Sequence, residues 1–229
     1  MWTTVTGRFL TREHGSLDDR PQVVGEAASE NGNSTWRNNA CGTRIFASTS
    51  PAASGYRRPV KHARRYSYVG PPELRDRVAS VDAVAVDTAA VLARWLAGRD
   101  RSELVEPFTF VVALDGDLRL APRRSEHVAL AGGHEVLAAG EIAFALAATG
   151  WHVVEVTNQS TGYCPDPDSW PAVSEALDRI GVRHPHDFTD KIIFRRCPAC
   201  GERNIVRDTD FTCAQCDSAL PARWNFPSN

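Results

Sequence analysis

Four cysteines near the end of the chain have the residue type and spacing of a metal site. They form two C-x2-C pairs, Cys197 with Cys200 and Cys213 with Cys216, separated by twelve residues. Each pair can form a tight turn that directs two sulfurs to one point, and two such turns make a tetrahedral site. Zn²⁺ prefers this geometry and ligand set, and mononuclear iron is the alternative. Because four thiolates fill every position, we expect one structural zinc ion per chain and no catalytic metal.

The same segment resembles a zinc ribbon over residues 194–220. The resemblance rests on Cys197-Pro198-Ala199-Cys200-Gly201 and on Cys213-Ala214-Gln215-Cys216. Asp217 stands where such turns often have glycine, and aspartate tolerates left-handed backbone better than most residues. Zinc ribbons contact nucleic acids or proteins, or they brace a fold. A phosphate-facing role is compatible with the arginines nearby, which are Arg195, Arg196, Arg203 and Arg207.

A second group of polar side chains lies upstream, between residues 123 and 165. His127 is a candidate acid or base, Glu141 a candidate carboxylate partner, and Tyr163 a candidate hydroxyl donor, so these three are the predicted catalytic residues. Arginine can hold an anionic group, and amide and hydroxyl groups can hold a substrate. The predicted substrate-binding residues are Arg123, Arg124, Asn158, Ser160 and Thr161.

A purely structural interpretation of these residues stands beside the functional one. The segment from Asn158 to Pro165 is then a turn whose Ser and Thr side chains satisfy backbone groups. Glu141 is then a surface carboxylate paired with an arginine. The chain contains no phosphate-loop spacing, no H-E-x-x-H or G-x-S-x-G motif and no Rossmann fingerprint.

The central region resembles a block of uncharacterised bacterial effector-like or toxin-like proteins. Three segments follow in the order of that block: His127 to Gly133, Ala139-Gly140-Glu141, and Asn158 to Pro165. The block has Asn-x-Ser-Gly-His-Tyr-x-Pro as its third segment, whereas this chain lacks the histidine there. The resemblance implies neither a reaction nor a cofactor.

Two further sets of residues have a reactive type. Cys164 could be a nucleophile with His127 or His152, but this requires a lowered thiol pKa, and an ordinary half-buried thiol is the prediction. His184 and His186 have a spacing that could hold a metal. The proline between them and their polar neighbours favour a surface loop instead.

Composition and cysteine use indicate a compartment. The 229 residues are 42% hydrophobic and 24% charged, which is typical of a soluble globular protein. No apolar run approaches the ~18 residues that span a bilayer, and the first residues lack the apolar stretch of a secretory signal. We therefore expect a cytoplasmic protein with no membrane contact, whose paired cysteines bind metal and do not form disulfides.

Charge is uneven along the chain. Residues 1–68 carry ten basic and five acidic side chains, residues 69–190 ten and nineteen, and residues 191–229 six and four. The basic run from Arg57 to Arg65 precedes two tyrosines, so it could hold phosphate and stack on bases. A solvated tail is the alternative. Because 24 of the 26 basic residues are arginine, the arginine count by itself does not indicate nucleic-acid binding.

The periodicity of apolar residues predicts an α+β fold, with an antiparallel sheet and flanking helices. Segment 1–65 is of low complexity and expected to be loosely ordered, 66–190 is the α+β domain, and 191–229 is the ribbon packed on it. Strands are expected at 108–114, 118–120, 136–146, 151–157 and 192–194. Helices are expected at 73–79, after an N-cap at Asp87, and from Asp168 or Ser169 to Ile180.

Two functional hypotheses follow. The leading one is a zinc-binding protein with a polar ligand pocket, whose side chains suit hydrolysis or group transfer on a nucleotide-like or other anionic substrate. The alternative is a non-catalytic module in which the ribbon and the basic N-terminal segment bind nucleic acid or a protein. Whether the protein is an enzyme stays open at this point.

Overall fold

The computed structural model describes residues 64–76 and 82–227. The predicted low-complexity segment therefore lies outside the described residues, except for Arg64 and Arg65. Cys41 and the basic residues from Arg57 to Lys61 are among the positions outside.

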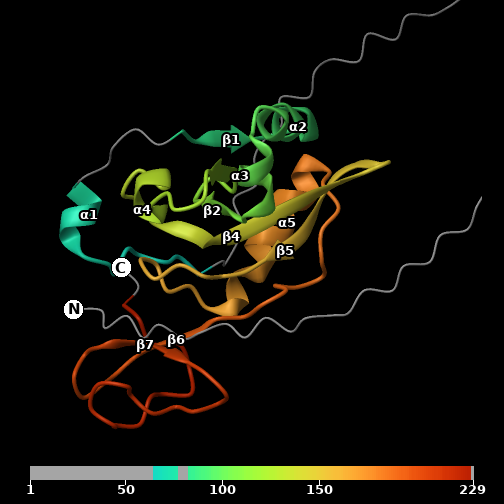
Figure 1. The fold of residues 1–229 in the computed structure, drawn as a ribbon. Helices are drawn as coiled ribbons and strands as arrows, with labels where there is room; N and C mark the ends of the chain where they lie inside the picture. The colour runs from blue at the N-terminus through green and yellow to red at the C-terminus, as the bar shows by residue number, and fades with distance from the viewer. Residues whose placement is uncertain (1–63, 77–81, 228–229) are drawn as a thin grey trace, which may run out of the picture. The chain divides into compact units, whose positions relative to one another are not determined.

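A five-stranded antiparallel sheet forms the centre of the described chain (Figure 1). Its spatial order is β1-β3-β2-β4-β5, and every neighbouring pair is antiparallel. Together with the helices, this confirms the predicted α+β class. The strands are β1 (Val84–Val86), β2 (Phe108–Ala113), β3 (Leu118–Ala121), β4 (Val136–Ala147) and β5 (Gly150–Val156).

Short turns set the register of the sheet. The Asp115-Gly116 turn joins β2 to β3, and Gly116 has a φ of 83°, which glycine adopts without strain. All six residues of β2 are buried, as expected for a central strand with both faces covered. β4 and β5 form a long hairpin in which Ile142 lies opposite Val156. The four predicted strands of this region are confirmed to within one residue at most ends.

Helices cover both faces of the sheet. They are α1 (Pro72–Asp76), α2 (Ala89–Ala97), α3 (Arg101–Val105), α4 (His127–Leu130) and α5 (Trp170–Ile180), with a 3-10 turn at Pro167–Ser169. The N-cap of α2 is Thr88 and not Asp87, because the Thr88 hydroxyl accepts the backbone N–H of Val91 at 3.3 Å. The helix expected at 73–79 is described only as far as Asp76.

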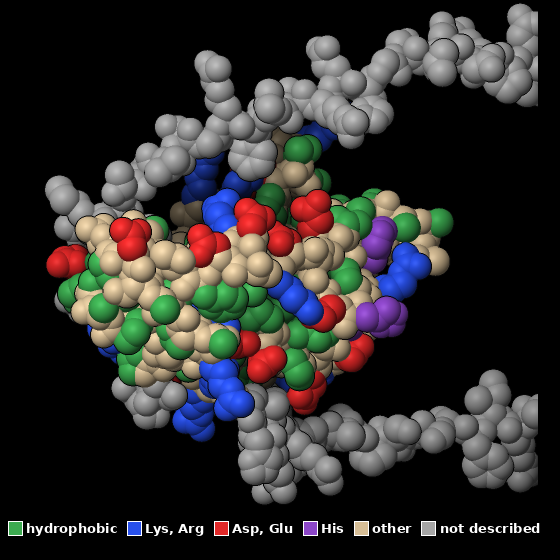
Figure 2. All heavy atoms as spheres, turned by 90° about the horizontal axis from the view of Figure 1, so that it is seen from below, with side chains coloured by type: hydrophobic (Ala, Val, Ile, Leu, Met, Phe, Trp, Pro, Cys, Tyr) green, Lys and Arg blue, Asp and Glu red, His purple; other side chains and the backbone are tan. Residues whose placement is uncertain are grey.

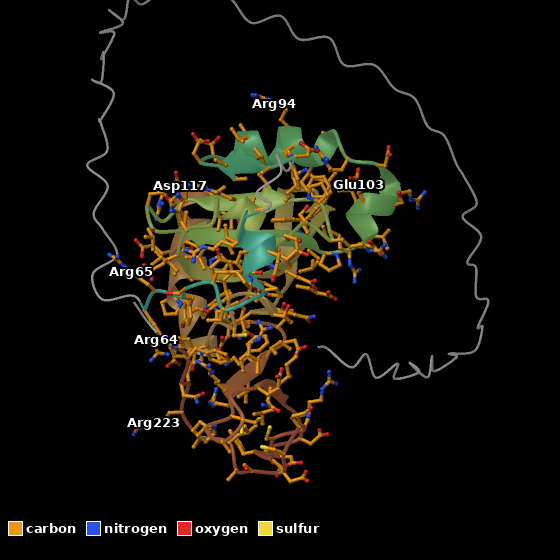
Figure 3. The ribbon with its side chains drawn as sticks, turned by 90° about the vertical axis from the view of Figure 1, so that its left-hand side faces the viewer. Arg64, Arg65, Arg94, Glu103, Asp117 and Arg223 are labelled. Carbon is orange, nitrogen blue, oxygen red and sulfur yellow. The ribbon has the colours of Figure 1, made fainter. Side chains whose placement is uncertain are left out.

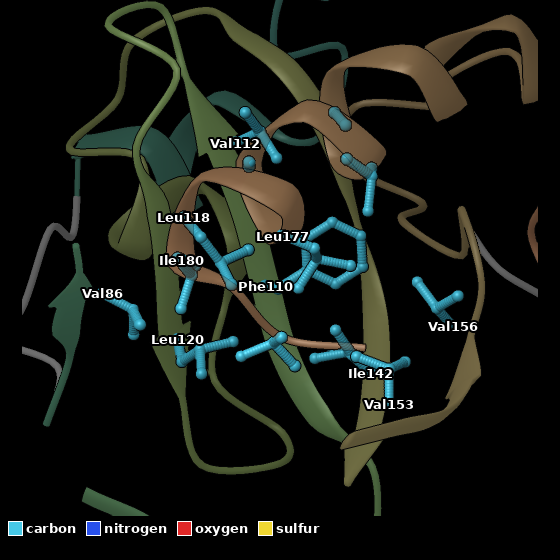
Figure 4. Close-up of a cluster of buried hydrophobic side chains, with 14 of the residues drawn as sticks. Val86, Phe110, Val112, Leu118, Leu120, Ile142, Val153, Val156, Leu177 and Ile180 are labelled. Atoms are coloured by element: carbon cyan, nitrogen blue, oxygen red, sulfur yellow. The ribbon is translucent and has the colours of Figure 1, made fainter. Parts of the chain in front are cut away.

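The main hydrophobic core lies between the sheet and α5 (Figure 4). Leu177 and Ile180 of this helix pack with Phe110, Leu120 and Ile142 of the strands, and all are at least 94% buried. Gly181 ends α5 in left-handed conformation, directly after the predicted last helical residue, Ile180.

A smaller core covers the opposite face of the sheet. Tyr66 pairs with Val136 through two backbone hydrogen bonds, and its ring joins Val128 of α4 and Tyr163 in a buried cluster. Neither β1 nor the short helices α3 and α4 is predicted by the apolar pattern, because each has five residues or fewer.

The chain after the sheet forms a separate two-stranded antiparallel ladder. β6 (Ile193–Arg196) pairs with β7 (Arg203–Val206), with Arg196 opposite Arg203. The predicted strand leading into the first cysteine pair is confirmed, and its partner β7 was not predicted. Among the helices described, none is long and apolar enough to cross a membrane.

Candidate metal centre

Two turns of matching geometry carry the four cysteines. In the first, Gly201 N–H donates to the Cys197 carbonyl at 2.9 Å, and in the second Asp217 N–H donates to the Cys213 carbonyl at the same distance. The residue after each second cysteine is left-handed, with φ of 77° at Gly201 and 56° at Asp217. The aspartate therefore takes the glycine position, as its tolerance of this backbone region allows.

The four sulfurs converge on one point. They lie within 4.8 Å of one another, with 3.6 Å between Cys197 and Cys216 and 3.7 Å between Cys200 and Cys213. A tetrahedron with about 2.3 Å between metal and sulfur has edges of about 3.8 Å. A disulfide would require about 2.05 Å. The spacing therefore fits four ligands around a metal ion and excludes sulfur–sulfur bonds in this arrangement.

Neighbouring groups act on the thiols. Hydrogen bonding with the Ser218 hydroxyl and backbone lowers the pKa of Cys216 to about 6, and the backbone N–H of Gln215 lowers the pKa of Cys213. The pKa of Cys200 is raised to about 12, because the backbone N–H of Glu202 stabilises its thiolate less than desolvation and the three nearby sulfurs disfavour it. Four thiolates this close repel one another, and a cation removes that repulsion.

Asn204 is a polar residue of the centre that the sequence did not single out. Its side chain is buried, its Oδ1 accepts the Ala214 N–H at 3.0 Å, and its Nδ2 lies 3.6 Å from the Cys213 sulfur. It therefore joins β7 to the second cysteine turn. An asparagine between two cysteine pairs has no distinctive sequence signal.

Contacts join the cysteine-bearing segment to the sheet domain. The Trp224 indole donates to the Cys164 carbonyl at 2.7 Å, and its ring packs edge-on against Tyr66. The Arg195 guanidinium donates to the carbonyls of Pro221 and Ala222, which fixes the chain leading to Trp224. In Figure 3 the sulfur atoms gather within this C-terminal segment.

His127 contacts the backbone of β4 at the residue before Glu141. His127 begins α4, and its Nε2 lies 3.0 Å from the carbonyl of Gly140, the residue before Glu141. Because a carbonyl only accepts, Nε2 carries the proton. Burial lowers the pKa of His127 to about 4, so the ring is neutral at pH 7. Burial raises the pKa of Glu141, and the Arg123 guanidinium opposes this rise.

The two arginines of the predicted pocket are exposed. Arg123 forms an ion pair with Glu106, at 3.3 Å from Nη1 to Oε1. Arg124 has a φ of 69°, in the left-handed region that a non-glycine residue rarely adopts.

Asn158 and Tyr163 are held by backbone groups. Asn158 is buried, donates to the carbonyls of Pro165 and Ile192 at 2.8 Å each, and accepts the Ile192 N–H at 2.7 Å. Tyr163 is also buried, and its hydroxyl donates to the His134 carbonyl at 2.7 Å. Burial raises the pKa of Tyr163. In this structure both side chains stabilise the turn that the sequence offered as the alternative.

Ser160 and Thr161 differ in their surroundings. Ser160 is buried, and its hydroxyl has no hydrogen-bond partner among the described residues. Thr161 is exposed, and its carbonyl accepts from Arg203 at 3.0 Å. Two hollows of about 380 and 240 Å³ lie elsewhere, and none of the predicted pocket residues lines either of them.

The remaining reactive residues have structural surroundings. Cys164 is fully and not half buried, and burial raises its pKa to about 12, which disfavours the thiolate that a nucleophile needs. His184 Nε2 lies 3.2 Å from Asp178 Oδ1, while His186 is exposed.

Known proteins provide no relative from which the role of the cysteine centre could be inferred. No protein-family model, curated protein or solved structure matches the chain. The resemblance of the central region to effector-like proteins therefore has no support from relatives. What stands is the cluster of four cysteines at metal-binding distance.

Proposed function

We propose that the protein binds one Zn²⁺ ion through Cys197, Cys200, Cys213 and Cys216, as a zinc ribbon does. The observation that carries this proposal is the pair of sulfur–sulfur distances, 3.6 and 3.7 Å, close to the edge of a four-thiolate zinc tetrahedron. Iron fits the same ligand set, so the metal's identity requires elemental analysis. Free thiols at this spacing suit a reducing compartment, which supports a cytoplasmic location.

The bound metal has a structural role in this proposal. Four thiolates leave no open position for water or a substrate, so the ion itself performs no catalysis. It holds two turns that otherwise have few apolar contacts: the cluster around them contains Val206 and Leu220, with Ile193 and Phe211 at its edge. Metal binding therefore supplies a large part of the folding free energy of this segment.

Replacement of one ligand tests this role. Cys200→Ser leaves three thiolates, and we expect it to lose the metal and to unfold the chain beyond Ile193 before the five-stranded sheet. Cys41→Ser is the matched control, because it removes a cysteine outside the quartet. Hydrogen exchange monitored by mass spectrometry reports which segment opens. Full metal content and unchanged protection in Cys200→Ser would refute the assignment.

A ligand pocket around His127 and Glu141 is the second proposal, with hydrolysis or group transfer on an anionic substrate as its reaction. Two observations favour it: the pKa values of both residues are shifted by burial, and the Ser160 hydroxyl is buried without a described partner. His127 accepts a proton at Nδ1, Glu141 polarises the nucleophile, and Arg123 holds the anionic group. Tyr163 and Asn158 position the turn.

Binding and turnover measurements separate this pocket from a structural turn. A panel of nucleotides and esters is tested with the wild-type chain, with His127→Gln and with Glu141→Gln. We expect at least about a hundredfold loss of turnover in either variant, as for removal of an acid–base group. Glu155→Gln removes an exposed carboxylate of β5 and is the control. If the wild-type chain converts none of the compounds in the panel, the proposed enzymatic activity is contradicted.

A nucleic-acid or protein contact through the ribbon and the basic N-terminal segment remains the alternative proposal. Arg64 lies over the Trp224 ring at 4.9 Å and within 3.6 Å of Asp166, so this end of the basic run contacts the described domain. Arg64, Arg65 and Arg223 project on one side in Figure 3. On the face in Figure 2, acidic and basic side chains are interspersed. Nucleic-acid affinity that falls steeply with salt, and falls further in Arg57→Gln and Arg58→Gln, would support this alternative.

A further inference from the structure

A small hollow beside the first cysteine turn has the lining of an anion site. Its volume is about 240 Å³, and it is lined by Val69, Arg196, Gly201, Arg203 and Phe226. Two of these five residues carry a guanidinium group, and no carboxylate is among them. The two arginines are direct partners across the β6–β7 ladder, so their side chains start from adjacent positions.

Backbone carbonyls hold both guanidinium groups in place. Arg196 Nε donates to the Gly201 carbonyl at 3.2 Å, and Arg203 Nη1 donates to the carbonyls of Val69 and Thr161 at 2.9 and 3.0 Å. Arg196 forms no ion pair with any residue that the structure describes. Because its described partner is a neutral carbonyl, Arg196 keeps its full positive charge, and a side chain already held in place loses little entropy when an anion binds.

Arg203 produces a positive potential that acts on neighbouring groups. It opposes the rise in pKa that burial imposes on Tyr68 and on Cys164. An anion at the hollow experiences the same attraction. With Zn²⁺ bound as proposed above, the four thiolates would leave a charge of −2 near Gly201, and this charge would work against a bound anion. The alternative role for Arg196 and Arg203 is therefore to compensate the negative charge of the metal centre, without binding an anion.

We propose that this hollow binds the phosphoryl group of a phosphate ester. Guanidinium groups donate readily to phosphate oxygens, and the side chains of Val69 and Phe226 provide an apolar wall for the organic part. Drug-sized ligands need about 300 to 1,000 Å³, so about 240 Å³ suits a single phosphate with a small attached group. The phosphate ester is either a free nucleotide or one unit of a nucleic-acid strand.

Calorimetric titration of the full-length, metal-loaded chain tests the proposal with three probes. These are adenosine monophosphate, adenosine, and a single-stranded oligonucleotide without a terminal phosphate. We expect saturable binding of a phosphate-bearing probe and none of adenosine. Tighter binding of the mononucleotide identifies a free nucleotide, and tighter binding of the oligonucleotide identifies a strand. Equal affinity for adenosine, or binding of neither phosphate-bearing probe in the millimolar range, would overturn the proposal.

Two further readouts locate the binding. Arg196→Gln is expected to weaken it at least about tenfold, since a hydrogen bond to a charged group is lost. Arg207→Gln changes an exposed arginine of the same segment outside the hollow, so an equal loss in that variant would show diffuse attraction and overturn the site. Nuclear magnetic resonance of the unmodified chain does not depend on variant folding. The amide signals of Val69 and Gly201 shift on addition of ligand if the site is correct, and shifts confined to other residues contradict it.

Discussion

His127 shows how an expected catalytic side chain can have a mainly structural environment. Its type and its place among glycines suggested acid–base chemistry, and no local pattern indicated that its ring would be held by the Gly140 carbonyl. Burial of the ring, and not a charged partner, lowers its pKa to about 4. The burial of His127 depends on residues that are distant from it in the sequence. The local sequence pattern therefore could not predict it.

The lowered pKa of His127 gives stability a definite pH dependence. The unfolded histidine takes up a proton near pH 6.5 and the folded one near pH 4, so the unfolded state binds more protons between these values. The histidine contribution is therefore fully present above pH 6.5 and is lost as pH falls towards 4, by at most about 1.4 kcal/mol per pH unit.

Urea unfolding of wild type and His127→Gln measures this contribution. Both proteins carry the same thiolates, so the difference between their pH profiles isolates the imidazole. We expect the free energy of unfolding of wild type to fall more steeply between pH 6.5 and 4. Parallel profiles would contradict the buried, neutral ring.

The four cysteines are the residues whose arrangement in space was best predicted. Two C-x2-C pairs specify a local geometry through their own turns, so little long-range information is needed. Asp217 fits the same logic, since the left-handed conformation expected of it is observed. Asn204 and Trp224 depend on tertiary contacts, and their parts in the centre and its docking were not foreseen.

Among the elements, long strands and the helix α5 were predictable and short elements were not. β2, β4 and α5 have clear apolar periods and turn residues at their ends. β1, α3 and α4 have at most five residues, and only packing against the sheet defines them. A polar insert between two cysteine pairs likewise gave no strand signal, although β7 forms there by pairing with β6.

Gly140 in β4 requires the absence of a side chain. A Cβ at this position would lie 1.9 Å from the Thr157 carbonyl oxygen, a backbone atom that cannot move aside easily. Gly140→Ala is therefore expected to destabilise the protein by about 3 kcal/mol or more, the upper range for overpacking. Thermal and urea unfolding measure the change.

Gly98→Ala is the matched control for this substitution. Its added Cβ would lie 3.5 Å from the Trp95 carbonyl oxygen, an ordinary contact, and the φ of Gly98 is −85°. We expect a change within about 0.5 kcal/mol. Equal stability of the two variants would show that β4 and β5 are not as close as described.

In the molecule as a whole, the segment after the second cysteine pair returns to the sheet domain. Trp224 is central to this contact, through its hydrogen bond to the Cys164 carbonyl and its packing on Tyr66. Arg203 adds a second link, to the carbonyls of Val69 and Thr161. A metal ion bound by the four cysteines, as proposed, would therefore stabilise a segment that also covers part of the smaller core.

Two substitutions of Trp224 separate the hydrogen bond from the ring packing. Trp224→Phe removes the indole donor and is expected to cost about 1 kcal/mol. Trp224→Ala also removes the ring, and we expect about 3 kcal/mol in total. Arg223→Ala changes the exposed neighbour and should lie within about 0.5 kcal/mol of wild type. If Trp224→Ala is as stable as Arg223→Ala in urea, Trp224 does not anchor the C-terminal segment to the sheet domain.

The structural role proposed for the C-terminal segment depends on one zinc ion bound by four thiolates. Native mass spectrometry combined with elemental analysis of the purified chain, expressed without added metal, measures it most directly. We predict about one zinc per chain, because four thiolate ligands complete the coordination of one ion. Cys41→Ser is expected to retain this zinc, and Cys200→Ser is expected to lose it. A chain that carries no metal, or a Cys200→Ser variant that keeps a full complement of zinc, would contradict the claim.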